Sequence, residues 1–157
     1  MKLKLINAGI HNISDNFALI FFKYTKKMDR KILSTASIFG LIAIVLGAFG
    51  AHALKKVLDF QELNTFETGV KYQLAHALFL LFLGTNSLIS QKRKTILFYL
   101  TFFGVFLFSG SIYLLATNRL TTFDFRVIGF VTPIGGLLLI LAWSILFLSF
   151  ITKKNSL

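Results

Sequence analysis

The chain has 157 residues, of which 55% are hydrophobic and 15% charged, whereas a soluble domain carries about a quarter charged residues. This composition excludes an ordinary soluble protein and indicates an integral membrane protein, with the lipid bilayer as its first partner. The formal net charge of +11 comes from short clusters between apolar runs, which argues against a nucleic-acid partner, and the absence of cysteine excludes disulfides and thiolate chemistry.

The first 27 residues do not match the membrane domain that follows. Asp15 and Asn16 interrupt the hydrophobic core that a signal peptide needs, and no small-residue cleavage site follows. Met28 opens the basic flank MDRKIL directly before the first long apolar run. We therefore predict an N-terminal extension over residues 1–27, either disordered or upstream of a start at Met28, and one membrane domain over residues 28–157.

Four apolar runs are each long enough to cross the hydrocarbon core, which takes about 20 helical residues. They have no Asp, Glu, Lys or Arg in their interiors and cover approximately residues 33–54, 72–90, 95–117 and 127–150. The QKRK connection is so short that the second and third runs must form an antiparallel hairpin. The fold class is therefore predicted to be all-α, an integral membrane four-helix bundle.

The connection between the first two spans is patterned like a helix. Its apolar residues recur at three- and four-residue steps from Phe60 to Val70, and polar residues fall between them. Asp59 and Glu62 have the spacing of a capping box, which starts helices. We predict a short amphipathic helix that lies at the outer interface and runs into the second span.

Lysines and arginines are unevenly divided between the two sides of such a bundle. If the chain crosses the membrane once at each of the four spans, 12 of the 17 lysines and arginines lie on the side that holds both termini and the QKRK loop. The positive-inside rule assigns the richer side to the cytoplasm. We therefore expect a multi-pass protein of the plasma (inner) membrane with its N- and C-termini in the cytoplasm.

Small residues mark faces where helices can approach closely, because hydrophobic force does not drive helices together in lipid. Ala43, Gly47 and Ala51 are spaced by four on one face of the first span, and Gly104 and Gly110 leave room for a neighbouring helix on the third. Two interpretations remain open, a packing groove within one bundle and the seam of a homo-oligomer.

The TPIGG motif places Pro133 well inside the predicted fourth span. Proline removes one helical hydrogen bond there, so we expect a kink, with Gly135 and Gly136 allowing another helix to approach closely. The kink is either a static packing feature or a hinge beside a cavity, as in transporters.

Polar side chains gather at the predicted outer ends of the spans. The candidate cluster consists of His52, Glu67, Tyr72, Gln73, His76 and Arg126. Tyr72 and Gln73 lie four and three residues before His76, so these three share one helical face. Ionisable groups in a membrane are costly enough to count as functional candidates. The cluster fits a hydrogen-bond network that fixes how the first two spans meet, and it also fits a ligand or proton site.

No metal, other cofactor or catalytic residue is assigned. Two histidines with Glu67 would suit zinc in their chemistry, but Glu67 lies nine residues before His76, on the opposite helical face. The sequence also contains no phosphate-binding glycine loop, nucleophile elbow or HExxH motif. The signatures of common enzymes are therefore missing.

Four motifs in order carry a resemblance to a known family: GAFGAHALKK (47–56), FETGVKYQLAHAL (66–78), FSGSIYLL (108–115) and TPIGGLLLILAW (132–143). With them, the chain from about Ile32 to Phe150 resembles the YgdD/YwdK family of small bacterial inner-membrane proteins, described as a domain of unknown function. The resemblance implies four spans and supplies no activity, substrate or catalytic residue. Its matching positions include Gly50, Gly69, Tyr113 and Trp143 besides the candidates above.

Three function classes fit these observations. The first is a non-enzymatic membrane component, structural or bound to a membrane-protein partner, which the small size favours. The second is an oligomeric transporter or channel subunit for an ion or small solute, and the third is a metal- or cofactor-binding enzyme subunit. A water-accessible cavity from His52 and His76 toward Pro133 would favour transport.

Overall fold

The computed structural model describes the backbone of residues 2–152 and the side chains of residues 26–152. Four α-helices follow one another along the described chain: α1 (Lys2–His52), α2 (Phe60–Thr85), α3 (Gln91–Ala116) and α4 (Val131–Ile151). Short 3-10 turns occupy the connections: η1 (Leu54–Lys56), η2 (Asn118–Leu120) and η3 (Phe125–Ile128). The described residues contain no strand, so the predicted all-α class is confirmed.

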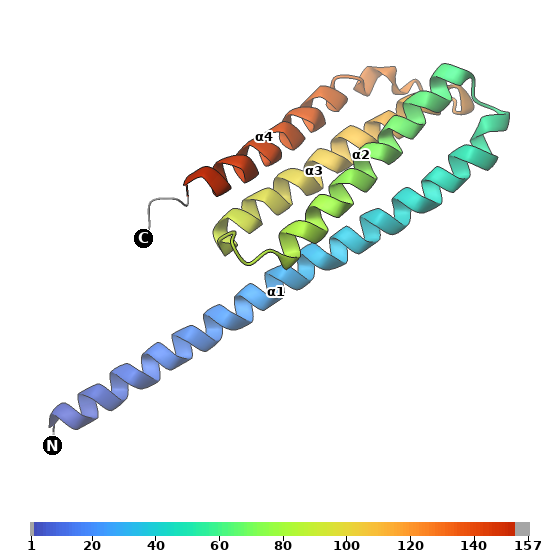
Figure 1. Cartoon of the computed structure of the whole chain (residues 1–157). Helices are drawn as coiled ribbons and strands as arrows, with labels where there is room; N and C mark the ends of the chain where they lie inside the picture. Colours follow the sequence, from blue (N-terminus) through green and yellow to red (C-terminus); the bar gives the residue numbers. More distant parts are fainter. Residues whose placement is uncertain (1, 153–157) are drawn as a thin grey trace.

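The helices run up and down beside one another, with α2 and α3 at the centre (Figure 1). α1 packs along α2 and α4 packs along α3, so α1 and α4 lie at opposite edges of the molecule. The largest buried cluster joins Ile32 of α1, Leu80 of α2, Leu97 of α3 and Ala142 of α4. Each predicted apolar run therefore corresponds to one helix of a shared core.

The first half of α1 extends beyond the end of the other three helices (Figure 1). It contains residues 2–27 of the predicted extension. The described side chains begin at Lys26, so most of that extension lies outside them. The nature of the extension and a start at Met28 remain predictions.

Three helical segments of the described chain are long and apolar enough to cross a membrane: Lys26–Lys56, Gln91–Ala116 and Phe125–Ile151. α2 is not among them, since Lys71, Gln73 and His76 in its first half lower its mean hydropathy. Length and composition therefore identify three of the four predicted spans.

α2 begins where the sequence predicts a helix. The Asp59 carboxylate accepts a hydrogen bond from the Glu62 N–H at 2.8 Å, and the Glu62 carboxylate accepts one from the Asp59 N–H at 2.9 Å, which completes the capping box. The chain then stays helical to Thr85, because this segment has no proline and its Gly69 is held against the Tyr113 ring. The predicted amphipathic helix is thus the first part of α2 and not a separate element.

α4 begins at Val131, later than the predicted span, and the expected kink at Pro133 is wrong. The residues before it form η3 and a turn instead of the start of an α-helix. Pro133 is therefore the third residue of α4, in the first turn, where a backbone N–H has no helical partner to lose. Proline here marks the start of a helix and not a hinge within one.

Small residues of α1 let α2 approach closely. A Cβ added to Gly50 would lie 3.3 Å from the Phe66 ring, Gly47 also faces α2, and Ala43 is buried. Ala51 is exposed, so its assignment to this face is wrong. The reason is geometric: seven residues from Ala43 return within about 20° of the same direction, whereas eight residues overshoot it by about 80°.

Gly135 lets α4 approach the backbone of α3 closely. A Cβ on Gly135 would overlap the backbone of Phe108, and one on Gly136 would make an ordinary contact of 3.5 Å with the Phe108 ring. A Cβ on Gly110 would meet nothing within 4 Å, so the predicted notch at Gly110 is not used among the described residues. At Gly104, the other glycine of the predicted pair, a side chain of α4 packs directly onto the helix.

Candidate functional site

Gln73 of α2 joins three helices. Its side chain is buried, its Nε2 donates to the Phe39 carbonyl of α1 at 2.9 Å, and its Oε1 accepts from the Tyr113 hydroxyl of α3 at 3.0 Å. A buried amide needs such partners, because lipid offers it none. These contacts agree with the prediction that Gln73 belongs to a hydrogen-bond network that positions the helices.

His76 lies almost one turn further along α2 and joins it to α4. Its Nδ1 lies 2.8 Å from the Tyr72 carbonyl oxygen, and its Nε2 lies 3.3 Å from Nε1 of Trp143. The indole N–H can only donate, so Nε2 accepts and Nδ1 carries the proton that is donated to Tyr72. Both nitrogens of a neutral imidazole are therefore engaged.

A groove of about 400 Å³ opens beside His76, and we call it the α2–α4 groove. Three helices line it: Tyr72 and His76 of α2, Phe108 of α3, and Gly136, Leu139, Ile140, Trp143 and Ser144 of α4. Ile140 and Trp143 are exposed, so the groove lies on the lateral surface of the bundle. Neither His52 nor Pro133 is part of it.

The other members of the predicted polar cluster do not reach the buried face of α2. His52 is exposed at the end of α1. Glu67 lies 3.5 Å from Lys71 along the surface of α2, and Arg126 lies 4.0 Å from Asp124 beside η3. Among the side chains of residues 26–152, no three His, Asp or Glu groups lie close enough to hold a metal ion. Of the predicted cluster, the structure thus places Tyr72 beside His76, whereas Gln73 bonds to α1 and α3.

A separate set of polar contacts fastens the connections at the same end of the bundle as His52. Arg119 lies 3.2 Å from the Glu62 carboxylate and also donates to the Val57 carbonyl. The Asn118 side chain accepts from the Phe125 N–H at 2.6 Å. The connection after α3 is therefore tied to the start of α2 and to itself.

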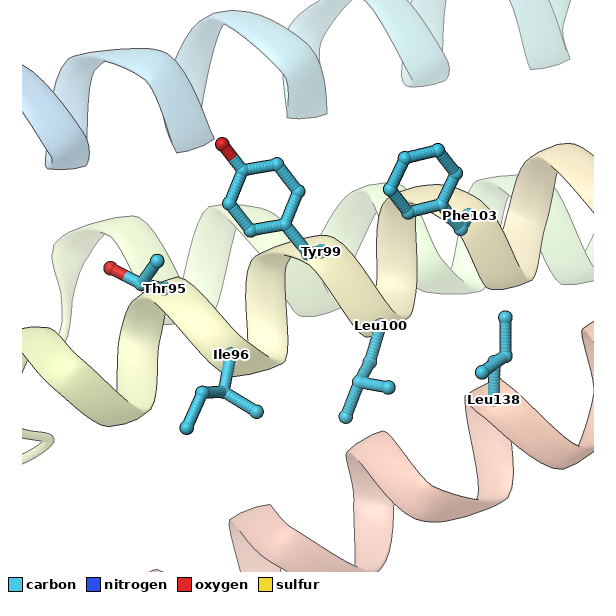
Figure 2. Close-up of a pocket in the computed structure, with 6 residues that line it drawn as sticks. All are labelled: Thr95, Ile96, Tyr99, Leu100, Phe103 and Leu138. Carbon is cyan, nitrogen blue, oxygen red and sulfur yellow. The ribbon is translucent and has the colours of Figure 1, made fainter.

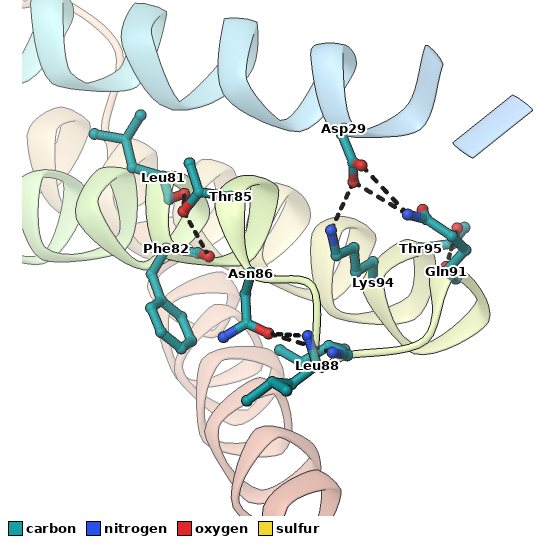
Figure 3. Close-up of polar contacts among 10 residues, drawn as sticks. Asp29, Leu81, Phe82, Thr85, Asn86, Leu88, Gln91, Lys94 and Thr95 are labelled. Atoms are coloured by element: carbon teal, nitrogen blue, oxygen red, sulfur yellow. Dashed lines mark hydrogen bonds and ion pairs between the residues drawn. The ribbon is translucent and has the colours of Figure 1, made fainter. Parts of the chain in front are cut away.

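The opposite end of the bundle contains an ion pair that was not predicted (Figure 3). Nζ of Lys94 lies 2.8 Å from Oδ1 of Asp29, and these side chains are 3% and 30% exposed. The Gln91 amide donates to both carboxylate oxygens at 3.3 Å. Figure 3 shows Asp29 of α1 directed at the first turn of α3. This pair therefore holds α1 against α3 at the level where the described side chains begin.

Two signals could have pointed to the missed partners. Trp143 is the only tryptophan of the chain and stands in an apolar run, where its N–H needs an acceptor. Asp29 is the single acid in a basic flank. Neither signal names the partner, because pairing with His76 or Lys94 depends on which helices are neighbours.

Comparisons with known proteins point to one family. The family model described as "Protein of unknown function (DUF423)" matches residues 46–136. The UPF0382 inner membrane protein YgdD of Escherichia coli (strain K12) is 38% identical over 131 residues, which cover 81% of this chain and 94% of that protein. A UPF0382 membrane protein of Haemophilus influenzae is 34% identical over 128 residues, which cover 81% of this chain and 99% of that protein.

A UPF0382 membrane protein of Staphylococcus saprophyticus is 40% identical over 106 residues, which cover 68% of this chain and 84% of that protein. No solved structure matches the chain. The resemblance predicted from the four motifs is confirmed, and the names of the relatives describe membrane proteins without an activity. The chain therefore belongs to the DUF423 family, which includes these UPF0382 membrane proteins.

Proposed function

We propose that this protein is a non-enzymatic, four-span component of the inner membrane that acts by binding other membrane components through its lateral surface. The observation that supports this role is the use of its buried polar side chains. Gln73 and His76, the best functional candidates of the sequence, are each engaged with neighbouring helices. They fix the positions of the helices, and the surface that meets lipid is then available for recognition.

The packing of α2 supports a four-span topology. α2 lies between α1 and α3 and buries Gln73 toward them, whereas His76 is buried toward Trp143 of α4. Leu74, Leu78 and Phe82 are exposed on its outer side. Its lipid-facing side is therefore apolar although its mean hydropathy is low. This arrangement supports α2 as the fourth span beside the three identified by composition.

The charges at the two ends of the bundle support cytoplasmic termini. The end with the α2–α3 turn has a single acid, Asp29, and seven cations: Lys26, Lys27, Arg30, Lys31, Lys92, Arg93 and Lys94. The end with η1 and η2 has four acids and five cations among the described residues. The positive-inside rule assigns the first end to the cytoplasm.

The transporter alternative is less well supported. A cavity linking His52 and His76 toward Pro133 would have favoured it. The α2–α4 groove includes His76 alone of these three, and His52 is exposed at the end of α1. Pro133 lies at the start of α4 and provides no hinge.

Site-specific photo-crosslinking in native membranes tests the proposed role. A photoreactive residue at Phe147, which is 65% exposed on α4, should give discrete adducts with a second copy, another protein or a lipid. The same residue at Ala142, which is fully buried, should give none. Purified protein that moves an ion or solute across liposomes, and loses this activity in His76→Ala, would replace the proposed role with the transporter alternative.

A further inference from the structure

The outer face of α3 carries a second groove, which shares no lining residue with the α2–α4 groove (Figure 2). This α3 groove has a volume of about 330 Å³ and is lined by Thr95, Ile96, Tyr99, Leu100, Phe103 and Leu138. Figure 2 shows Tyr99 and Phe103 directed toward α1, and Ile96 and Leu100 directed toward α4. The Thr95 hydroxyl donates to the Gln91 carbonyl of its own helix, so the lining presents mainly apolar surface.

Two lysines lie near the α3 groove. Nζ of Lys31 donates to the Tyr99 hydroxyl at 3.0 Å and lies 4.8 Å from the centre of the Tyr99 ring. Lys92 is exposed and lies three residues before Thr95, on the same face of α3. Neither lysine forms an ion pair among the described side chains, because the one acid at this end, Asp29, is bound to Lys94.

We infer that the α3 groove binds one acyl chain of an anionic phospholipid, with the lipid phosphate held between Lys31 and Lys92. The groove runs from Thr95 to Phe103, about 12 Å along the helix at 1.5 Å per residue. It therefore accepts the part of the acyl chain nearest the headgroup. The phosphate would meet Lys92, which precedes the groove on α3, and Lys31, which contacts Tyr99 in its lining. This inference rests on the proposed function and deepens it by naming a lipid recognised at the lateral surface.

The position of the site agrees with this occupant. Lys31 and Lys92 belong to the cation-rich end of the bundle, which the proposed topology places in the cytoplasmic leaflet. That leaflet is the one whose anionic lipids attract basic residues near the membrane surface. The Tyr99 hydroxyl lies at the level of Lys31, from which it accepts a hydrogen bond, as aromatic residues of the membrane interface do.

The shape of the α3 groove favours a lipid chain over another helix. Helices that pack closely in lipid need small residues at their contact. The exposed face of α3 instead presents Ile96, Tyr99 and Phe103, which are 43% to 50% exposed, and Gly104 is covered by α4. A thin, flexible chain can lie between such large side chains without displacing them.

Native mass spectrometry of the purified full chain tests this inference. Titration with phosphatidylglycerol and with phosphatidylcholine of the same acyl chains should show preferential binding of phosphatidylglycerol. Lys31→Gln and Lys92→Gln should each lower that affinity about fivefold, and the double variant about 25-fold, as expected for lysines beside an anionic headgroup. Ile96→Trp should weaken binding without any change of charge, because the indole fills the groove.

A matched control separates this site from general charge attraction. Lys55→Gln combined with Lys56→Gln removes the same charge from η1, at the opposite end of the bundle, and should leave the affinity unchanged. Equal losses in the two double variants, or equal binding of the two lipids, would overturn the inference. So would a lipid-free dimer that disappears in Ile96→Trp, since the groove would then hold a second copy.

The outcome is independent of the test of the proposed function. Absence of lipid selectivity together with adducts at Phe147 would remove the α3 site and keep the lateral binding role. Selective binding of phosphatidylglycerol together with solute transport would keep the site and remove that role.

Discussion

At the scale of single residues, buried polar groups in this protein connect helices. Gln73 bonds to α1 and α3, His76 bonds to Trp143, and the Ser111 and Thr132 hydroxyls of α3 and α4 lie 2.7 Å apart. Each such bond in a membrane contributes only about 0.6 kcal/mol on average, because separated helices also find partners. Their main consequence is therefore to select one arrangement of apolar helices.

The bond between Gln73 and Tyr113 can be measured by a double-mutant cycle. Gln73→Leu and Tyr113→Phe should each lower the free energy of unfolding, with a coupling between them of about 0.6 kcal/mol and at most about 1.7 kcal/mol. Unfolding of the detergent-solubilised protein measures all four variants. Tyr72→Phe is the control, since no hydrogen bond of its hydroxyl is found among the described residues, and zero coupling between Gln73 and Tyr113 would contradict the structure.

The pair between Asp29 and Lys94 should respond unequally to removal of its two members. Asp29→Asn should destabilise the protein by about 2 kcal/mol, less than the 3–5 kcal/mol of a fully buried pair, because it leaves a buried ammonium without a carboxylate. Lys94→Met should cost less, since the Asp29 side chain is partly exposed and keeps Gln91 as a donor. Thermal unfolding of the two variants measures this difference. A larger loss of stability in Lys94→Met than in Asp29→Asn would mean that Lys94 is the better solvated member of the pair.

At the scale of helices, two pairs come close through glycine and alanine. α1 meets α2 along Ala43, Gly47 and Gly50, and α4 meets α3 at Gly104 and Gly135. These contacts explain why a bundle without hydrophobic force between its helices holds together, since close approach increases van der Waals contact. They also assign most of the predicted small-residue stripe to packing within one chain.

Substitutions at two glycines distinguish a glycine at a close helix contact from a glycine that no other helix approaches. Gly135→Ala should lower stability by about 2 kcal/mol, because the added methyl group overlaps the backbone of Phe108, which cannot rotate away. Gly110→Ala should be neutral or slightly stabilising, since its Cβ meets nothing within 4 Å. Unfolding midpoints that move equally for both variants would count against the observed crossing of α3 and α4.

At the scale of the whole molecule, the four helices form two edges around a central pair, and the charges separate to the two ends. The α2–α3 turn and the start of the described α1 side chains share the cationic end. The connections η1, η2 and η3 share the other end, where Arg119 and Glu62 tie them together. This distribution supports one orientation of the whole bundle in the membrane.

The absence of cysteine makes the orientation directly testable. Ser87→Cys in the α2–α3 turn and Thr122→Cys in the connection after η2 are both exposed positions. In intact cells, a membrane-impermeant maleimide should label Thr122→Cys and reach Ser87→Cys only after the membrane is opened. Labelling of Ser87→Cys alone in intact cells would contradict either the proposed orientation or the crossing of α2. Labelling of both would mean that α3 does not cross the membrane.

Sequence by itself determined the membrane class, the all-helical fold, the capped start of α2 and the family, because these depend on composition and on spacing along one chain. The tertiary structure decided which polar residues meet. His52, Glu67 and Arg126 lie apart from Gln73 and His76, whereas Trp143 and Tyr113 lie beside them. Such contacts join residues 40 or 67 positions apart. These contacts depend on how each helix is rotated about its axis and on which helices are its neighbours. A uniformly apolar run specifies neither, because lipid accepts every side of such a helix equally well.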